Sequence, residues 1–467
     1  MRQIAIIGGG ISGLSAAHAI ERLSNQAGIS AQVTVFEKEE RTGGKVWSRH
    51  EEGFLCEWGP NGFLDSKPMT LELCARLGIS EKLQRSDDNA RKRFIYASGE
   101  LHSLPENGPT FLKSKLISWP GKVRLAAELF IPPRRDGVDE TLAAFARRRL
   151  GSEALDKLIG PMVSGIFAGD PETMSLKSCF PRICELEQQY GGLLKAMMLL
   201  AKKKKAEVKA GKAVASAAGP AGILTSFVGG IQDLTTATAA ALHGPVRTNA
   251  TVTTLRRKSD GFELLLADGS SVSTELVIFA APAYALATMT ENFDAEMAEI
   301  LRQIPYAPMN VICSGYEREK ISRNLDAFGY LIAKKEGRAT LGTLWDSSIF
   351  PNRAPQGRVL LRSMMGGATN PAAIDLSDSE VLGKVRADLQ QIMGISAEPD
   401  FVRIFRHPQA IPQYTVGHSR RVEALRARAA LAPGLFLTGN AFFGVGLNDC
   451  VNASNQVADQ VLAHLQA

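Results

Sequence analysis

The sequence lacks the features of membrane-spanning, metal-binding and nucleic-acid-binding proteins. No run approaches the roughly 18 consecutive apolar residues of a spanning helix. Six cysteines are scattered through 467 residues without metal-ligand spacing, so we expect structural thiols in a reducing compartment and no bound metal. The formal net charge of +6 is modest, and the basic residues do not interleave with aromatic ones, which argues against a nucleic-acid partner.

The start of the sequence leaves little room for a targeting segment. The apolar run Ile4–Ile7 leads directly into Gly8, with only Met1–Gln3 ahead of it. We therefore expect no signal or transit peptide. The expected location is the cytoplasm, with peripheral association to the inner face of the cell membrane left open.

The composition that remains is that of an ordinary globular protein, with 45% hydrophobic and 22% charged residues. Because 467 residues exceed one ordinary core, we expect two or more domains. The slight positive charge would suit an anionic membrane surface or a substrate that carries carboxylates.

The N-terminal segment has the pattern of a parallel, doubly wound α/β unit. The apolar pattern predicts a buried strand at residues 3–7, an alanine-rich helix at 14–23, and a second strand at 33–36 that ends at Glu37. This order is typical of a Rossmann-like dinucleotide-binding domain.

The glycines between the first strand and the helix predict a phosphate site. In Gly8-x-Gly10-x-x-Gly13, the glycines permit a tight turn, close approach to a pyrophosphate, and packing of helix on strand. The helix N-terminus favours the negative charge. Glu37 would accept hydrogen bonds from the adenosine ribose, and a glycine-rich turn beside a surface acid is the alternative. The expected contacts in this loop are Gly8, Gly9, Gly10, Ile11, Ser12 and Gly13.

Two further segments favour FAD over a nicotinamide cofactor. Arg41-x-Gly43-Gly44 follows Glu37 by four residues, and this pairing resembles the second FAD fingerprint of the flavin amine-oxidase superfamily. Residues 53–63 resemble another superfamily segment, which runs beside the flavin. The resemblance implies FAD contacts from Lys38, Arg41, Gly44, Lys45, Trp58, Gly59, Pro60, Asn61 and Val252.

A glycine-rich string at 439–450 precedes an amphipathic C-terminal helix. Asn448 or Asp449 is expected to be the N-cap of this helix. A helix N-terminus directed at the flavin pyrimidine would stabilise negative charge on the reduced ring. The expected cofactor contacts here are Val445, Gly446 and Leu447.

This C-terminal string also resembles that of the protoporphyrinogen oxidase family of haem biosynthesis, and the resemblance covers essentially the whole chain. It implies an FAD-dependent oxidase that removes six electrons from a porphyrinogen in three hydride-plus-proton steps and passes them to dioxygen. It implies no metal and no side-chain base, so His407 and His418 are expected to be surface residues or to have satisfied hydrogen bonds. Further matches are Arg93-Phe94-x-Tyr96, Leu101-His102-x-Leu104-Pro105 and Phe167-Ala168-Gly169-Asp170.

The resemblance also implies which residues meet the polar and flat parts of the substrate. Arg93 would bind a ring propionate, because a guanidinium pairs with a carboxylate through two hydrogen bonds. A plain surface arginine beside Arg91 and Lys92 is the alternative. Gly165 matches a glycine whose backbone lies against the substrate, where a larger residue would block binding.

Apolar substrate contacts follow from the same resemblance. Phe328, Leu331 and Met364 match residues that enclose the macrocycle, with Met365 as the alternative to Met364. Periodicity alone would assign all of them to the core.

The expected architecture is an α/β fold with three parts. A discontinuous FAD-binding domain would comprise residues 1–66, 223–285 and 426–467, and a mixed α+β substrate domain would comprise 286–425. A mainly helical insertion at 67–222 would face the substrate and corresponds to the part that supports membrane association in relatives.

Within the insertion, the lysine tract 202–205 and the residues up to Gly222 are expected to form a mobile linker. The lysines could attract anionic lipid by up to about 1 kcal/mol per charge, and a solvated linker explains them equally well. Helices are expected at 68–77, 123–130, 141–150 and 192–200.

Several alternatives remain open at the level of function. Coproporphyrinogen III oxidase has the same fold and a substrate with four propionates rather than two, and the basic run at 91–93 could serve either substrate. A flavin amine oxidase, a carotenoid desaturase and a non-catalytic flavin-binding partner protein are more distant. The C-terminal string favours protoporphyrinogen, and a homodimer is retained as one quaternary state.

Overall fold

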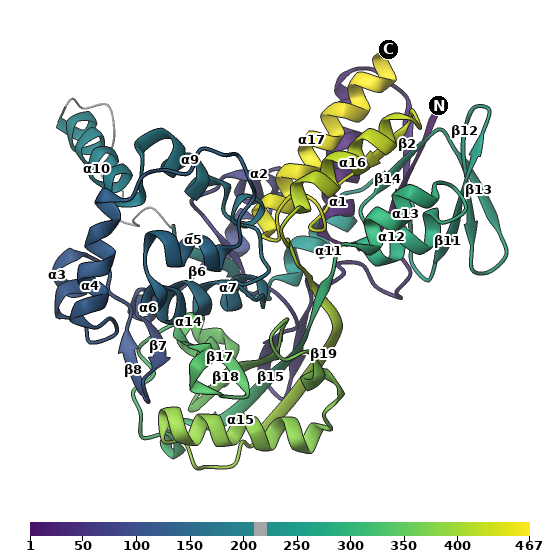
Figure 1. Cartoon of the computed structure of the whole chain (residues 1–467). Coiled ribbons are helices and arrows are strands. Elements are labelled where there is room, and N and C mark those ends of the chain that lie inside the picture. The colour runs from purple at the N-terminus through teal and green to yellow at the C-terminus, as the bar shows by residue number, and fades with distance from the viewer. Residues whose placement is uncertain (210–221) are drawn as a thin grey trace.

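In the computed structural model, which describes residues 1–209 and 222–467, a five-stranded parallel sheet stands beside a seven-stranded sheet (Figure 1). The strand order of the parallel sheet is β10-β2-β1-β14-β20, and its strands come from three separated parts of the chain. The predicted α/β class is confirmed. The strands are β1 (Arg2–Ile7), β2 (Ala31–Phe36), β10 (Val246–Arg247), β14 (Leu276–Phe279) and β20 (Leu435–Leu437).

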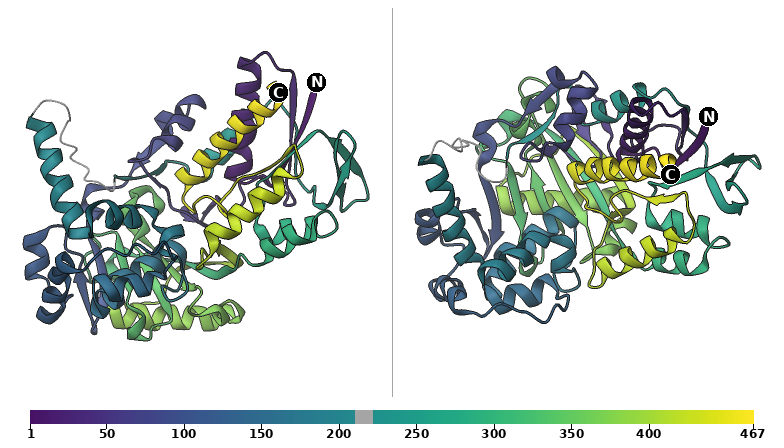
Figure 2. Two further views of the ribbon diagram at one scale, coloured as in Figure 1. Left: turned by 45° about the horizontal axis from the view of Figure 1, so that its top comes forward. Right: turned by 90° about the horizontal axis from the view of Figure 1, so that it is seen from above.

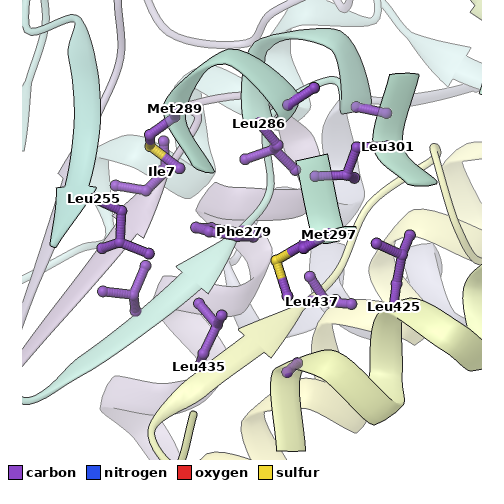
Figure 3. Packing of buried hydrophobic residues seen from close by; sticks show 14 of the residues in the cluster. Ile7, Leu255, Phe279, Leu286, Met289, Met297, Leu301, Leu425, Leu435 and Leu437 are labelled. Atoms are coloured by element: carbon purple, nitrogen blue, oxygen red, sulfur yellow. The ribbon is translucent and has the colours of Figure 1, made fainter. Parts of the chain in front are cut away.

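Helices cover both faces of the parallel sheet, because successive side chains of each strand point to opposite sides. Ile4 and Ile6 pack against α1 (Ile11–Gln26) and α17 (Leu447–Gln466). On the other face, Phe279 lies among Leu286, Met297 and Leu425 from three helices (Figure 3). These helices are α12 (Ala283–Thr290), α13 (Ala295–Arg302) and α16 (His418–Ala430).

Asp268-Gly269 is a dipeptide typical of tight turns between strands, and it lies in the turn of a hairpin, with Gly269 at a positive φ of +84°. It belongs to the three-stranded sheet β11 (Val252–Lys258), β12 (Gly261–Leu266) and β13 (Ser271–Thr274). Two smaller sheets pair β3 (Ser48–Glu51) with β4 (Phe54–Glu57), and β5 (Phe63–Leu64) and β6 (Leu83–Arg85) with β9 (Leu224–Phe227).

The seven-stranded sheet has the order β19-β15-β18-β17-β16-β7-β8, and α15 (Asp378–Met393) packs on one of its faces. Two of its strands come from the range expected to be mainly helical, so that expectation is incomplete. The strands are β7 (Arg93–Ala97), β8 (Glu100–Ser103), β15 (Tyr306–Glu317), β16 (Gly329–Ile332), β17 (Thr340–Leu344), β18 (Arg358–Gly366) and β19 (Phe401–Pro412).

Each of the four expected helices is present, with bounds shifted by a few residues or, in the second, a change to 3-10 geometry at Ala127–Phe130. The linker expected to begin at 202 is wrong, because α10 continues through the lysines to Lys209; alanine, lysine and glutamate are good helix formers. The rest of that prediction, 210–221, lies outside the described residues. The helices are α2 (Met69–Arg76), α3 (Gly108–Lys113), α4 (Trp119–Ala126), α5 (Leu142–Arg149), α6 (Ser152–Ala154), α7 (Gly160–Phe167), α8 (Leu176–Cys179), α9 (Pro181–Tyr190), α10 (Leu193–Lys209), α11 (Gln232–Ala240) and α14 (Asp346–Ile349).

Helix α10 projects from the body of the molecule at the end that carries α3 and α4, and both views of Figure 2 show it there. Among the residues that the structure describes, no helix has the length and apolar character needed to span a bilayer.

Candidate functional site

The first glycine turn is closed on its inner side and open at the helix N-terminus. A Cβ on Gly13 would lie 1.9 Å from the Gly8 carbonyl oxygen, whereas a Cβ on Gly10 would meet nothing within 4 Å. Gly10 is the N-cap of α1 and supplies no side chain to cap its N–H groups. The turn therefore offers an open, uncapped helix end, which fits a pyrophosphate group.

The second fingerprint lies directly against the first. The Gly43 N–H donates to the Gly9 carbonyl at 2.8 Å, and a Cβ on Gly44 would lie 3.3 Å from the Gly10 Cα. Glu37, buried at the end of β2, accepts the Gly9 N–H at 2.8 Å through Oε2. Its Oε1 accepts the Glu39 N–H at 3.0 Å, so the carboxylate braces the turn and keeps lone pairs for a ribose hydroxyl.

Two basic residues of the second fingerprint are held without a carboxylate partner in the described structure. The Arg41 guanidinium lies 4.2 Å from the centre of the Trp47 ring and donates to the Gly44 carbonyl at 3.0 Å. Lys45 Nζ donates to the carbonyls of Gln409 and Ala410, and burial lowers the pKa of Lys45 to about 8. Two half-buried basic side chains beside a glycine turn with an uncapped helix end suit an anionic cofactor.

Two other expected contacts occupy less enclosed positions. Lys38 is exposed and pairs with Glu39 at 3.2 Å. Val252, the first residue of β11, is partly buried and packs against the core cluster that contains Phe279.

At the C-terminal string, the expected N-cap is wrong. Helix α17 begins at Leu447 and its N-cap is Gly446, so Asn448 lies inside the first turn. The Asn448 side chain instead accepts the Thr70 N–H at 3.2 Å and donates to the Leu64 carbonyl at 2.9 Å. This helix end is therefore also without a side-chain cap.

The two ends of the chain meet through these helices. Ser454 of α17 donates to the Ser12 carbonyl of α1 at 2.7 Å, and the helices share the core that contains Ile6. Two uncapped helix N-termini, those of α1 and α17, therefore belong to one packed unit.

Tyr414, which no motif indicated, holds the C-terminal string in place. Its hydroxyl donates to the Asn440 carbonyl at 2.6 Å and accepts the Gly444 N–H at 2.8 Å. The His418 ring stacks on Tyr414 with centroids 4.0 Å apart. Both histidines considered from the sequence are buried: His407 has the expected satisfied hydrogen bond, to the Trp58 carbonyl at 2.9 Å, whereas His418 is no surface residue.

The expected substrate residues gather on one face of the seven-stranded sheet. Leu331 of β16 is paired with Gly342 of β17, and Gly342 with Met364 of β18, so Leu331 and Met364 flank a position without a side chain. A Cβ on Gly165 would lie 2.9 Å from Leu331 Cδ1, which places α7 over this row.

Arg93 lies two residues from that row on the same face, because Ile95 is the register partner of Leu331. Its guanidinium lies 5.2 Å from the centre of the Phe328 ring. Gly165 and Arg93 are exposed while Phe328, Leu331 and Met364 are half-buried, so the face is open. Met365 points to the opposite side, into the core under α15, which favours Met364.

The three basic residues at 91–93 differ in their partners. Arg91 pairs with Asp88 at 2.7 Å and Lys92 pairs with Asp326 at 2.8 Å. The structure gives Arg93 no carboxylate partner among the described residues. Arg93 is therefore the cation of this run that is available to a ligand.

Comparison with known proteins agrees with this geometry. The family described as flavin containing amine oxidoreductase matches residues 11–462. The coproporphyrinogen III oxidase of Bacillus subtilis (strain 168) is 30% identical over 99% of this chain and 98% of its own. The chloroplastic protoporphyrinogen oxidase 1 of Spinacia oleracea is 32% identical over 98% of this chain and 84% of its own.

Solved structures show the same fold. A protein of Exiguobacterium sp. 255-15, provisionally named a protoporphyrinogen oxidase, superposes with a TM-score of 0.84 at 26% identity, over 99% of both chains. A putrescine oxidase variant superposes with a TM-score of 0.69 at 18% identity over 99% of both chains, a likeness of fold alone. The chain thus belongs to the flavin containing amine oxidoreductase family, in the group of protoporphyrinogen and coproporphyrinogen oxidases, and is an FAD-dependent oxidoreductase.

Proposed function

We propose that the protein oxidises protoporphyrinogen IX to protoporphyrin IX, with dioxygen as the final electron acceptor. The observation that carries the proposal is the open face on which Arg93 lies beside Phe328, Leu331 and Met364. An unpaired guanidinium next to an apolar row suits a macrocycle that is apolar in its body and carries carboxylates at its edge.

The chain's residues would divide the work between cofactor and substrate. The glycine turn and the uncapped end of α1 would hold the FAD pyrophosphate, and the uncapped end of α17 would favour negative charge on the ring. When bound, FAD supplies the two-electron acceptor for each oxidation step. Arg93 would fix the substrate by a propionate. Gly165 lets α7 pack directly on Leu331, since a Cβ at this position would lie 2.9 Å from Leu331 Cδ1.

Coproporphyrinogen III is the second candidate, and similarity to the Bacillus subtilis relative supports it. A substrate with four propionates calls for more free cations than one with two. Since Arg91 and Lys92 already pair with Asp88 and Asp326, the charge at this edge favours the substrate with fewer carboxylates.

The test is a comparison of steady-state kinetics on both porphyrinogens, followed by porphyrin fluorescence. We expect higher kcat/KM for protoporphyrinogen IX, and we expect Arg93→Ala to raise KM by about tenfold to a hundredfold, as for loss of a charged hydrogen bond. Lys92→Ala is the matched control, and its KM should change little because Lys92 is already paired. Equal kinetics for Arg93→Ala and the parent enzyme would remove Arg93 from the site.

We further propose that the helical end of the molecule rests on the inner face of the cytoplasmic membrane. Trp119, Val123 and Phe130 have exposed fractions of 67%, 67% and 86%, and Met197 on neighbouring α10 is 64% exposed. Large apolar side chains exposed together are typical of an interfacial surface. Homodimer formation and the boundaries of the three domains stay predictions.

A further inference from the structure

The loop from Glu57 to Asn61 forms hydrogen bonds with side chains of the seven-stranded sheet. Arg362 Nη1 donates to the Gly59 carbonyl at 2.9 Å and to the Glu57 carbonyl at 3.4 Å. His407 Nε2 lies 2.9 Å from the intervening Trp58 carbonyl. Three consecutive carbonyls of the loop thus meet donors from β18 and β19.

These donors decide where the loop lies, because a buried carbonyl is costly without a partner. Arg362 is 2% exposed and His407 is 7% exposed. The other side of the loop is also tightly packed, since a Cβ on Gly59 would lie 2.3 Å from the Lys45 carbonyl oxygen.

Asp346, at the start of α14, completes the arrangement. Its side chain is fully buried, and Oδ2 lies 2.9 Å from Arg362 Nε. Its Oδ1 accepts a hydrogen bond from Asn61 Nδ2 at 3.3 Å. Because an ionised carboxylate can only accept, it selects the amide nitrogen of Asn61 and so fixes which way the carboxamide points.

The same strand also carries a proposed substrate contact. Arg362 and Met364 are two residues apart on β18 and point to one face of the sheet. Register pairs connect Arg362 through Leu344 to Gly329, the partner of Arg93. The loop and the substrate face therefore share one rigid support.

We propose that Arg362 and Asp346 are positioning residues. They hold the loop at 57–61, and with it Asn61, in a fixed position relative to the substrate face. The inference rests on the proposed function in one respect, the placement of this loop beside the flavin. Arg362 and Asp346 act through the loop and touch neither cofactor nor substrate themselves.

The test uses the FAD-loaded variants Arg362→Met and Asp346→Asn, with Arg358→Met on the same strand as the matched control. Arg358 is partly exposed and pairs with Asp400 at 3.5 Å, away from the loop. We expect the first two variants to shift the visible spectrum and the reduction potential of the bound flavin. Their kcat should fall by roughly tenfold to a hundredfold, as for a small displacement of reacting groups, with KM nearly constant. Arg358→Met should match the parent in every readout.

One further variant, Arg362→Lys, separates a positioning role from a purely structural one. Arg362→Lys retains a cation that can donate to the Gly59 carbonyl. Its kcat and flavin spectrum should therefore lie between those of Arg362→Met and the parent. If Arg362→Met fails to fold, Arg362→Lys is compared with the parent in its place. A loss of thermal stability with unchanged spectrum, potential and kcat would overturn the proposal. Spectrum and potential are recorded without substrate, so they remain informative even if neither porphyrinogen proves to be oxidised.

Discussion

Gly10 and Gly13 lie in one turn, and the structure makes opposite demands on them. A side chain on Gly13 would collide with the Gly8 carbonyl, whereas one on Gly10 would extend into open space at the end of α1. Gly13 is therefore needed for the turn to form, and Gly10 is needed for a ligand to approach the N-terminus of α1.

This difference gives the first prediction. Gly10→Glu should fold with a thermal midpoint close to that of the apoprotein, yet purify colourless, because its carboxylate occupies and repels the phosphate position. FAD content after gel filtration measures the effect. Gly383→Ala in α15, where a Cβ meets nothing within 4 Å, is the control and should keep full FAD. A yellow Gly10→Glu protein would move the phosphate away from this turn.

At this scale, the sequence predicted the residues that follow a spacing rule. The glycine turn and its contact with Gly43 have such spacing, and the structure brings them together. Tyr414 and Arg362 follow no spacing rule, since each forms hydrogen bonds with a segment far from it in the chain. The prediction of an N-cap at Asn448 or Asp449 was wrong, because the Asn448 side chain forms hydrogen bonds with the backbone of α2 and β5 instead.

Among the elements, a buried guanidinium joins the helices of the insertion. Arg149 of α5 donates to Glu128 Oε1 at 2.7 Å and to the Gly191 carbonyl at 3.1 Å. Glu128 in turn accepts the N–H of Leu193 at the start of α10 at 2.8 Å. The side chains of Arg149 and Glu128 are fully buried, and Arg149 also pairs with Glu187 at 3.1 Å, so removing the guanidinium leaves buried carboxylate charge without its cation.

Arg149→Met should therefore lower the free energy of unfolding by about 3–5 kcal/mol, the cost of a buried charge left unpaired. Urea denaturation measures it. Arg182→Met, which breaks an exposed pair with Glu185, should cost less than about 1 kcal/mol. The double variant Arg149→Met/Glu128→Gln should recover part of the loss, and an equal loss in single and double variants would contradict the pairing account.

The exposed surface of α4 and of the 3-10 segment Ala127–Phe130 that follows it gives a prediction about membranes. Replacing Trp119, Val123 and Phe130 by serine should lower partition into vesicles of anionic phospholipid by at least about tenfold, because each buries apolar area in the interface. Leu431→Ser, at a site 73% exposed on another side of the molecule, should leave partition unchanged. Equal sedimentation of the triple variant and the parent with vesicles would refute this surface.

Element prediction succeeded where periodicity was strong and failed where composition misled. The strands and helix around the glycine turn and the hairpin at Asp268-Gly269 are confirmed. The lysine tract was assigned to a linker because it is charged, yet propensity carries α10 through it. β7 and β8 are short and pair with distant strands, which local pattern cannot show.

For the whole molecule, stability depends on imidazoles enclosed where separate segments meet. Burial lowers the pKa of His407 and of His418 from 6.5 to about 4. Between these values the unfolded chain binds protons that the folded chain does not. The contribution of each imidazole to stability is therefore fully present above pH 6.5 and is lost as the pH falls toward 4, by up to about 3 kcal/mol for each.

His418→Phe keeps a ring stacked on Tyr414 and removes one of these titrations. Its unfolding free energy should fall less steeply than that of the parent between pH 6.5 and 4. Denaturation at a series of pH values measures the slope, and His464→Phe, at an exposed site, is the control. Identical slopes for His418→Phe and the parent would show that His418 does not titrate in this range.

Whole-molecule organisation was only partly predictable. A nucleotide-binding α/β unit has a sequence rule, so its presence could be predicted. The sheet face that carries Arg93, Leu331, Met364 and Arg362 depends on the register of four strands, β7, β16, β17 and β18, and no local pattern fixes that register. Family resemblance supplied the expected substrate contacts, and the structure places those residues on one face of the sheet.

The central claim is that this FAD-dependent enzyme oxidises a porphyrinogen, protoporphyrinogen IX before coproporphyrinogen III. The most direct measurement is anaerobic mixing of the purified yellow protein with each porphyrinogen while flavin absorbance is followed. We expect both porphyrinogens to bleach the flavin and protoporphyrinogen IX to do so faster. Faster bleaching by coproporphyrinogen III would contradict the preference, and a bound flavin that neither substrate reduces would contradict the claim itself.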